Sequence, residues 1–421
     1  MPKYLKNKRR RRHNSFAFSK PEHIEMSSKE EKKPKKQTRE KQSVFRILNG
    51  KKHINKVRRL AFLSVILALF VAFSVIFFSA PTGIGDMFAG ISSFSFKSEF
   101  PVKLNSSETY NCVLKGSHLY VLSDGDVSCY HKNGKLSFSD AHGFTSPVLC
   151  ESEARCLVFD QNGNGIRVYN AGKKLLSIES KFSLLAADIG RNGYFAYASK
   201  SESYTSMVTV CDDEGKNFFE WYCAEETING VAVAPNGKTF AVTTLSVSNG
   251  KFNSKLYVLG LDSADPIFTK EYPGEIIYGI NSVNKKNFVV IGEKFCDIVS
   301  WKRHEITTFS TDYCIDGVKA TASHIFISSS RENNDGNTSF TVYNNRRKNV
   351  FSYTFNGPVD SFTVKGENVF VLSRNNIYRI NSKGEVKKQA SCGFGVIKIA
   401  AVSSTNCLAV GHNEVTKIHL S

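Results

Sequence analysis

The ten cysteines have the greatest chemical potential of the side chains in this sequence, and all of them follow residue 100. No two of them have the C-x-x-C spacing, so a zinc knuckle or a thioredoxin-type centre has no support. Their even number permits disulfides, and the pairs Cys150/Cys156 and Cys211/Cys223 could face each other across neighbouring strands. Most of the cysteines lie in apolar runs, where a free thiol packs as a small core residue. We therefore expect mostly free and buried thiols.

A second candidate is the segment Asp160-Gln-Asn-Gly-Asn-Gly165, which matches the opening of a calcium-binding loop. The twelfth position of such a loop requires a bidentate Glu, and here it is Ala171. An Asn-Gly hairpin turn followed by a strand explains the same residues. We therefore expect a turn here and no metal site.

Other catalytic patterns do not occur in the sequence. The ten histidines are scattered, and there is no H-E-x-x-H, G-x-S-x-G, P-loop or S-x-x-K motif. The carboxylate pairs Asp212/Asp213 and Glu225/Glu226 are adjacent along the chain, so in strands they would point to opposite faces. These observations predict no catalytic residue, no cofactor-binding residue, no metal ligand and no cofactor.

The positive charge of the chain belongs to its first 59 residues. The 421 residues include 56 Lys+Arg and 38 Asp+Glu, for a formal charge of +18. Residues 1–59 hold 21 of the basic and 5 of the acidic residues, which leaves 35 and 33, a net of +2, for the remainder. A basic folded nucleic-acid-binding domain is therefore not expected, nor a specific nucleic-acid partner. The low hydrophobicity of residues 1–59 predicts a disordered tail.

The segment Leu60–Ala80 has 21 residues without a charged side chain and is apolar on every helical face. As a helix it would span about 30 Å, the thickness of the hydrocarbon core of a bilayer. This predicts one transmembrane helix, acting as an uncleaved signal anchor, in preference to a buried core helix or a cleaved signal peptide. Residues 81–99 follow as a linker.

Basic residues immediately before this segment predict its orientation. They are Lys51, Lys52, Lys56, Arg58 and Arg59. Because positive charge is retained on the cytoplasmic side, residues 1–59 are expected in the cytoplasm and residues 100–421 outside it. The same cluster is expected to attract anionic lipid. The predicted location is the cell membrane, with a single pass.

Beyond residue 100, short apolar or alternating runs recur between Asn-Gly, Asp-Gly and Lys-Gly turns. The most regular run, exemplified by Thr239-Phe-Ala-Val-Thr and Asn368-Val-Phe-Val-Leu, returns about every 40 residues, which is typical of β-propeller blades. This predicts an all-β propeller over residues 100–421, with eight blades, or seven if two weak blades merge. The last blade has three strands, so we expect Phe100–Leu104 to supply its fourth strand and close the ring.

Two sequence segments resemble segments of known propellers. Gly230-Val-Ala-Val-Ala-Pro-Asn-Gly-Lys-Thr-Phe-Ala-Val is similar to the entry strands of bacterial WD40-like propellers. Val208-Thr-Val-Cys-Asp-Asp-Glu-Gly-Lys-Asn-Phe-Phe-Glu-Trp is similar to the outer hairpin of quinoprotein-like propellers. The whole layout resembles an uncharacterised family of membrane-anchored bacterial β-propeller proteins, and this resemblance implies architecture without implying catalytic residues.

The longest connections are expected between second and third strands, at Lys200–Ser206, Leu245–Ser254 and Ser329–Thr338. Such connections lie on one rim of a propeller, where loops carry binding functions. The side chains expected to anchor a protein partner there are Tyr204, Lys251, Phe252 and Arg331.

The sequence therefore predicts a non-enzymatic, membrane-anchored binding or scaffolding platform at the cell envelope. The alternative is an envelope enzyme, a hydrolase or a quinone-type oxidoreductase, with its site at the centre of the propeller. An enzyme is expected to gather charged or His residues at the mouth of the central channel, whereas a scaffold is expected to carry large aromatic or variable loops on one rim.

Overall fold

The computed structural model describes residues 62–68, 71, 98–105, 107–330 and 336–421. The predicted tail, most of the predicted span and linker, and Arg331 lie outside these ranges. Residues 62–68 and 71 of the predicted span are helical, and their side chains are exposed. Within the described ranges, no helix combines the length and the apolar character needed to cross a membrane.

Residues 102–419 form eight four-stranded antiparallel sheets. Seven of them keep the order of the chain from the inner to the outer strand, and in the eighth the outer strand is β1, the first strand of the chain. Blade 1 contains β2 (Thr109–Lys115), β3 (His118–Ser123), β4 (Asp126–His131) and β5 (Leu136–Ala141); blade 2 contains β6 (Pro147–Glu151), β7 (Cys156–Asp160), β8 (Gly165–Tyr169) and β9 (Lys174–Glu179). Blade 3 contains β10 (Leu184–Ile189), β11 (Phe195–Ser199), β12 (Ser206–Cys211) and β13 (Asn217–Cys223); blade 4 contains β14 (Thr227–Val233), β15 (Thr239–Ser248), β16 (Lys251–Gly260) and β17 (Phe268–Pro273).

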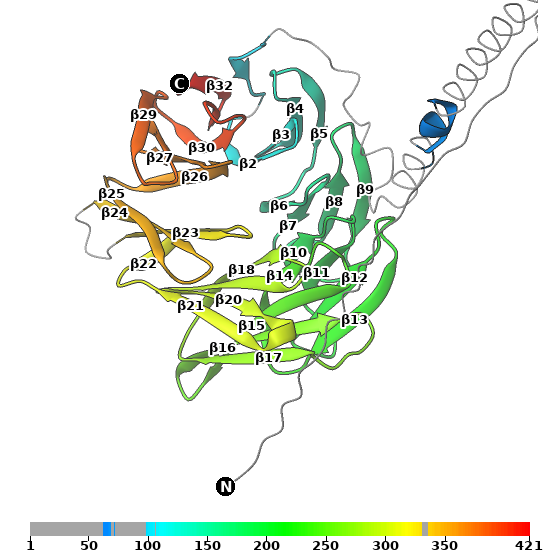
Figure 1. The fold of residues 1–421 in the computed structure, drawn as a ribbon. Helices are drawn as coiled ribbons and strands as arrows, with labels where there is room; N and C mark the ends of the chain where they lie inside the picture. The colour runs from blue at the N-terminus through cyan, green and yellow to red at the C-terminus, as the bar shows by residue number, and fades with distance from the viewer. Residues whose placement is uncertain (1–61, 69–70, 72–97, 106, 331–335) are drawn as a thin grey trace, which may run out of the picture. The chain divides into compact units, whose positions relative to one another are not determined.

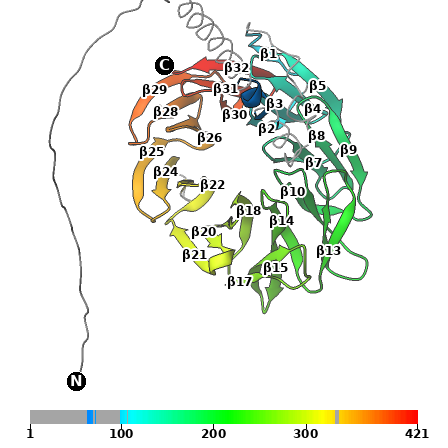
Figure 2. The same ribbon diagram turned by 45° about the vertical axis from the view of Figure 1, so that its right-hand side comes forward.

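Blade 5 contains β18 (Ile277–Asn284), β19 (Asn287–Gly292), β20 (Phe295–Ser300) and β21 (Glu305–Ser310), with the 3-10 turn η2 (Trp301–Arg303) before β21. Blade 6 contains β22 (Cys314–Ala320), β23 (His324–Ser330), β24 (Asn337–Asn344) and β25 (Asn349–Asn356). Blade 7 contains β26 (Val359–Lys365), β27 (Asn368–Ser373), β28 (Asn376–Ile380) and β29 (Val386–Ser391). Blade 8 contains β30 (Val396–Ala401), β31 (Asn406–Gly411), β32 (Glu414–His419) and β1 (Val102–Lys103). The predicted eight-bladed all-β propeller is confirmed, and Figures 1 and 2 show the blades following one another around a common centre.

The ring closes as the sequence predicts. Val102 of β1 pairs with Val415 of β32, and the Leu104 amide donates to the Asn413 carbonyl at 2.7 Å. Leu104 is buried in one cluster with Leu119 of blade 1 and other apolar side chains of blades 1 and 8. The strand is shorter than the predicted Phe100–Leu104, but the pairing gives blade 8 its fourth strand.

The blades pack face to face, which explains their apolar second strands. Phe240 in β15, Phe288 in β19 and Phe370 in β27 are fully buried, because a neighbouring blade covers each face of the sheet. Between blades 3 and 4, for example, Val208 of β12 and Val231 of β14 belong to one core cluster.

The alternating strand directions divide the connections between two faces of the ring. We call the face with the second-to-third and fourth-to-first connections the upper face, and the face with the first-to-second and third-to-fourth connections the lower face. The chain enters on the lower face, because the Glu99 amide donates to the carbonyl of Asn133, in the connection between β4 and β5, at 2.7 Å.

One expected loop is a hairpin. The predicted loop Leu245–Ser254 consists of the ends of β15 and β16, which pair without interruption up to Ser248 and Lys251. The two-residue turn Asn249-Gly250 has positive φ angles of 52° and 73°, as a tight hairpin turn requires. The Ser- and Asn-rich composition suggested a loop, but the alternation of side chains and the Asn-Gly pair make an extended hairpin. Lys200–Thr205 is a loop as predicted.

Candidate functional site: the upper face

The upper ends of the inner strands carry a recurring β-bulge. In seven blades the register between first and second strands shifts by one residue near the start of the inner strand. The extra residues are Tyr110, Leu185, Asn229, Tyr278, Asp316, Asp360 and Ile397. A bulge redirects a side chain out of the regular alternation. Five of these residues (Tyr110, Asn229, Tyr278, Asp316 and Asp360) are exposed at the upper face.

Glycine follows the extra residue in three of these bulges, at Gly230, Gly279 and Gly317. A Cβ atom on Gly230 would lie 2.5 Å from the Thr243 hydroxyl and 3.0 Å from a methyl group of Ile280 in blade 5. Only glycine therefore fits where blades 4 and 5 meet at this end of the inner strand.

The exposed aromatic side chains of the described propeller are concentrated on the upper face. Six of the seven belong to it: Tyr110, Tyr204, Tyr222, Phe252, Tyr278 and Phe394. The seventh, Phe218, starts β13 on the lower side. Phe394 is 93% exposed and Tyr278 is 64% exposed. The six side chains are spread over several blades, and Tyr204 and Tyr222 contact each other. Exposed aromatic side chains on one face are typical of a surface that binds a partner.

Blade 3 provides a groove on this face, which we call the upper groove. Its volume is about 580 Å³. One wall is the sheet, where the rows Tyr197/Thr209/Glu220 and Ser199/Met207/Tyr222 follow the strand register. The other wall comes from the connection Ser180–Phe182 and from the loop that holds Tyr204. The rings of Tyr204 and Tyr222 are 4.9 Å apart, so they form one aromatic surface.

Charged groups border the upper groove and are paired. Lys181 Nζ lies 2.9 Å from Glu202 Oε2 and 4.9 Å from the Phe182 ring. The Tyr222 hydroxyl donates to Glu220, and this hydrogen bond raises the pKa of Tyr222. The groove thus combines the Tyr204/Tyr222 ring pair with one basic and two acidic side chains, a mixture of aromatic and polar groups that is expected for contact with protein.

The structure places the predicted partner-binding residues as follows. Tyr204 lines the upper groove, and Lys251 and Phe252 lie at the tip of the β15–β16 hairpin on the next blade. Arg331 lies outside the described residues. The sequence prediction missed Tyr222, Phe182 and Tyr278, which sit in strands or short connections. In the sequence, the signal available for Tyr278 is that it directly precedes a glycine, Gly279, in an inner strand.

A buried ionic network supports the hairpin. Glu226 lies in the connection before β14, and its carboxylate receives hydrogen bonds from Lys255 Nζ at 2.8 Å, from the Tyr257 hydroxyl at 3.1 Å and from the Thr244 hydroxyl. Burial alone would raise the pKa of Glu226, but these hydrogen bonds outweigh it and hold the pKa below its usual value.

Charged groups are also present on the inner strands. Lys319 of β22 interacts electrostatically with Glu151, Lys115 and Lys398, which belong to three other blades, and burial lowers its pKa. Lys115 Nζ lies 3.2 Å from Glu151 Oε2. Burial raises the pKa of Asp188, on β10, to about 7, and its Oδ2 accepts the Val233 amide at 2.7 Å. The inner strands thus place three lysines and two carboxylates around the centre of the ring.

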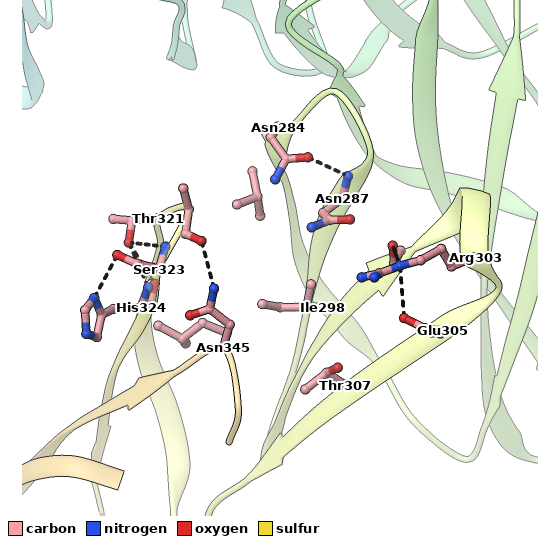
Figure 3. A pocket seen from close by; sticks show the side chains of 14 residues that line it. Asn284, Asn287, Ile298, Arg303, Glu305, Thr307, Thr321, Ser323, His324 and Asn345 are labelled. Carbon is pink, nitrogen blue, oxygen red and sulfur yellow. Dashed lines mark hydrogen bonds and ion pairs between the residues drawn. The ribbon is translucent and has the colours of Figure 1, made fainter. Parts of the chain in front are cut away.

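A second pocket, of about 160 Å³, lies between blades 5 and 6 on the lower face, and we call it the lower pocket (Figure 3). It contains the one Ser–His contact relevant to the enzyme alternative, in which Ser323 Oγ lies 2.9 Å from His324 Nδ1. These two residues are adjacent on a turn, where the Thr321 hydroxyl accepts the His324 amide at 3.0 Å. The nearby Glu305 is paired with Arg303 at 3.0 Å (Figure 3). The geometry is that of a hydrogen-bonded turn and lacks the carboxylate that would orient a catalytic histidine.

The cysteines are free thiols, as predicted, and seven of the ten are buried. The two proposed pairs do not face each other, because Cys150 opposes Leu157 and Cys211 opposes Asn217. Burial raises the pKa of Cys129 and of Cys296 to about 12, so these thiols are not activated nucleophiles.

The calcium-loop segment is a turn. Asp160 Oδ1 accepts the amides of Thr145 at 3.0 Å and Ser146 at 2.7 Å, and β8 begins at Gly165. Asp160 therefore holds the preceding connection in place. Among the described residues, no cluster of His, Cys, Asp and Glu could hold a metal ion.

Comparison with solved structures shows the fold. BamB from Moraxella catarrhalis matches with a TM-score of 0.52 and 12% identity, over 76% of this chain and 99% of that chain. Saccharomyces cerevisiae Sqt1 matches at 0.53 and 10%, over 76% and 98%. The C-terminal WD40 domain of Sif2 matches at 0.53 and 11%, over 78% and 100%. The similarity to WD40-like propellers is thus confirmed, and at these identities it extends to the fold alone.

A search of curated protein sequences finds no significant match. The model of a protein family, described as "Family of unknown function (DUF5711)", matches residues 91–420, which include the whole propeller. The chain therefore belongs to the DUF5711 family.

Proposed function

We propose that this protein is a membrane-anchored propeller that binds a protein partner through its upper face at the cell envelope. The observation that carries the proposal is the concentration of six of the seven exposed aromatic side chains of the described propeller on one face. Aromatic side chains contribute most of the binding energy in protein interfaces, because they bury much area and lose little conformational freedom.

The upper groove on blade 3 holds the two of these side chains that contact each other. Tyr204 and Tyr222 present adjacent rings, and the polar rows of blade 3 offer hydrogen-bonding groups beside them. The hairpin tip with Phe252 adds a second contact on blade 4, and the Glu226 network keeps this hairpin in place. A rigid sheet that carries aromatic anchors is preorganised for binding, which reduces the entropic cost of association.

The membrane part of the proposal is supported by the sequence. Leu60–Ala80 is long and apolar enough for one span, and the basic residues before it favour a cytoplasmic N-terminus. The propeller then lies outside the cytoplasm. Alkaline extraction of membranes tests the anchor. The full chain should stay in the membrane pellet, and a chain without residues 60–80 should be released. Release of the full chain would contradict anchoring.

Photo-crosslinking in intact cells tests the binding face. A photoreactive amino acid at Tyr204 or Tyr222 should capture a discrete protein partner. Phe218 is the matched control, because it lies on the same strand as Tyr222 with nearly equal exposure, 43% against 44%, but at the opposite end. Equal capture from Phe218 and from the two tyrosines would reject the upper face as the binding surface.

A further inference from the structure

Seven basic side chains line the lower connections of blades 5 and 6. They lie in the turn between β18 and β19, around η2, and in the turn between β24 and β25. The residues, which we call the lower basic arc, are Lys285, Lys286, Lys302, Arg303, Arg346, Arg347 and Lys348. All seven are exposed. The lower connections of these two blades contain no Asp or Glu.

This concentration of charge is local. Residues 60–421 carry a net charge of only +2, and the lower connections of blade 3 include the acidic run Asp212–Glu214. In the arc, Arg303 pairs with Glu305 at 3.0 Å. The described residues place no carboxylate within salt-bridge distance of Lys285, Lys286, Arg346 or Lys348. Unpaired basic side chains clustered on one side of a face are an electrostatic docking surface for a polyanion.

The lower pocket opens within the arc. Arg303 lines it together with the amide side chains of Asn284, Asn287 and Asn345 (Figure 3). Glu305, the partner of Arg303, also lines this polar recess, so the unpaired cations of the arc lie around the pocket and not in its wall.

The chain enters the propeller on this same face. The Glu99 amide is hydrogen-bonded to the turn between β4 and β5 in blade 1, which also contains the exposed Lys132 and Lys135. Residues 81–97 separate the predicted membrane span from this point, and an extended chain of that length reaches at most about 60 Å. Blade 1 and blades 5 and 6 lie on opposite sides of an eight-bladed ring. If the entry point and the arc both lie close to one surface, the whole lower face is parallel to that surface.

We propose that the lower face lies flat against an anionic lipid surface, with the lower basic arc on the lipid phosphates. This inference rests on the membrane anchoring proposed above. It assigns the two faces different partners, because the lower face contacts lipid while the upper face points away from the membrane and is free to bind protein. Each basic side chain close to an anionic surface strengthens such docking about fivefold.

Hydrogen–deuterium exchange of the full chain in nanodiscs tests the proposal. The segments 285–286, 301–304 and 345–348 should exchange at least about fivefold more slowly in discs with phosphatidylglycerol than in phosphatidylcholine discs. Added salt should reduce the difference, since the contact is electrostatic. The variant K285E/K286E/R346E/K348E should lose the protection.

The matched control carries four charge reversals on the upper face, K200E/K251E/K294E/R374E, and should keep the protection. Equal exchange in the two kinds of disc overturns the inference, and so does loss of protection in the control. Equal protection of the detergent-solubilised chain by soluble polyphosphate also overturns it, because the occupant would then be a soluble polyanion. A chain that does not enter either disc overturns the proposed anchoring itself, which distinguishes the two failures.

Discussion

Lys255 Nζ lies 2.8 Å from Glu226 Oε1, and this ion pair fastens the long β15–β16 hairpin to the connection that precedes blade 4. The same ammonium group also lies 3.4 Å from Glu271 Oε1 on the outer strand. The Glu226 side chain is 9% exposed and that of Glu271 is 69% exposed, so the two ion pairs of one lysine differ mainly in burial.

We predict that E226Q lowers the free energy of unfolding at pH 7 by about 1–3 kcal/mol, since it removes the charge from a buried carboxylate that accepts three hydrogen bonds. The pKa of Glu226 is below its usual value in the folded state, so its stabilising effect is present above about pH 4.5 and is lost as the pH falls further. The difference between wild type and E226Q should therefore shrink below pH 4. Denaturant unfolding at both pH values measures it.

The control for this prediction is E271Q, which removes the exposed partner of the same lysine. Exposed ion pairs contribute little, so E271Q should change stability by less than about 0.5 kcal/mol. A loss as large as that of E226Q would mean that burial does not distinguish the two pairs.

Asp188 should give the opposite dependence on pH. Burial raises its pKa to about 7, so between pH 4 and pH 7 the unfolded chain releases a proton that the folded chain keeps. Stability should fall over this window as the pH rises, by up to about 1.4 kcal/mol per pH unit. D188N cannot ionise and still offers an oxygen to the Val233 amide, so its stability should lack this decline. Parallel pH profiles of the two proteins would refute the assignment.

Ring closure depends on the packing of Leu104. L104A should lower the unfolding free energy by about 2–4 kcal/mol, since the removed methyl groups leave a cavity between blades 1 and 8. The matched substitution L136A lies on an outer strand, where the side chain is 47% exposed, and should cost less than about 0.5 kcal/mol. The unfolding midpoints of the two variants in urea compare them directly, and equal midpoints would show that Leu104 does not hold the ring closed.

The hairpin turn is sensitive to its glycine. G250A forces a Cβ atom onto a residue with φ of 73°, and no neighbouring atom lies within 4 Å, so the cost is conformational alone. We expect a loss of about 1 kcal/mol, confined to the hairpin. Hydrogen exchange should quicken at residues 246–253. G260A, at the other end of β16 without a positive φ, should leave these amides unchanged; faster exchange there in both variants would contradict the turn assignment.

The number of blades and the closure of the ring could be predicted from the sequence, because both depend on a strand pattern that recurs in every blade. The apolar second strands, such as those around Phe240 and Phe370, are buried on both sides and therefore stand out in the sequence. The closing strand could be predicted because the C-terminal part of the sequence supplies only three strands for blade 8.

The bulges and the upper groove could not be predicted from the sequence. They depend on one-residue shifts in strand pairing and on a loop packed beside a strand, and the periodicity of apolar residues reveals neither. Tyr222 lies in an outer strand whose alternation looks ordinary, and it becomes part of a groove because Tyr204 of the loop between β11 and β12 packs beside it with its ring tilted by 39°. The β15–β16 hairpin was expected to be a loop because its tip is rich in Ser and Asn, although the Asn249-Gly250 pair is itself a hairpin signal.

The pairing of Val102 with Val415 also has a consequence for biosynthesis. These residues are separated by nearly the whole propeller, so the ribosome must complete all eight blades before the ring can close. Closure is thus the contact of greatest sequence separation, and such contacts form late because the entropy of the long intervening loop must first be overcome. A polypeptide that ends before β32 leaves β1 without its partner and two sheet edges exposed, which are sites of aggregation. A closed propeller therefore requires that both β1 and β32 are present in the chain.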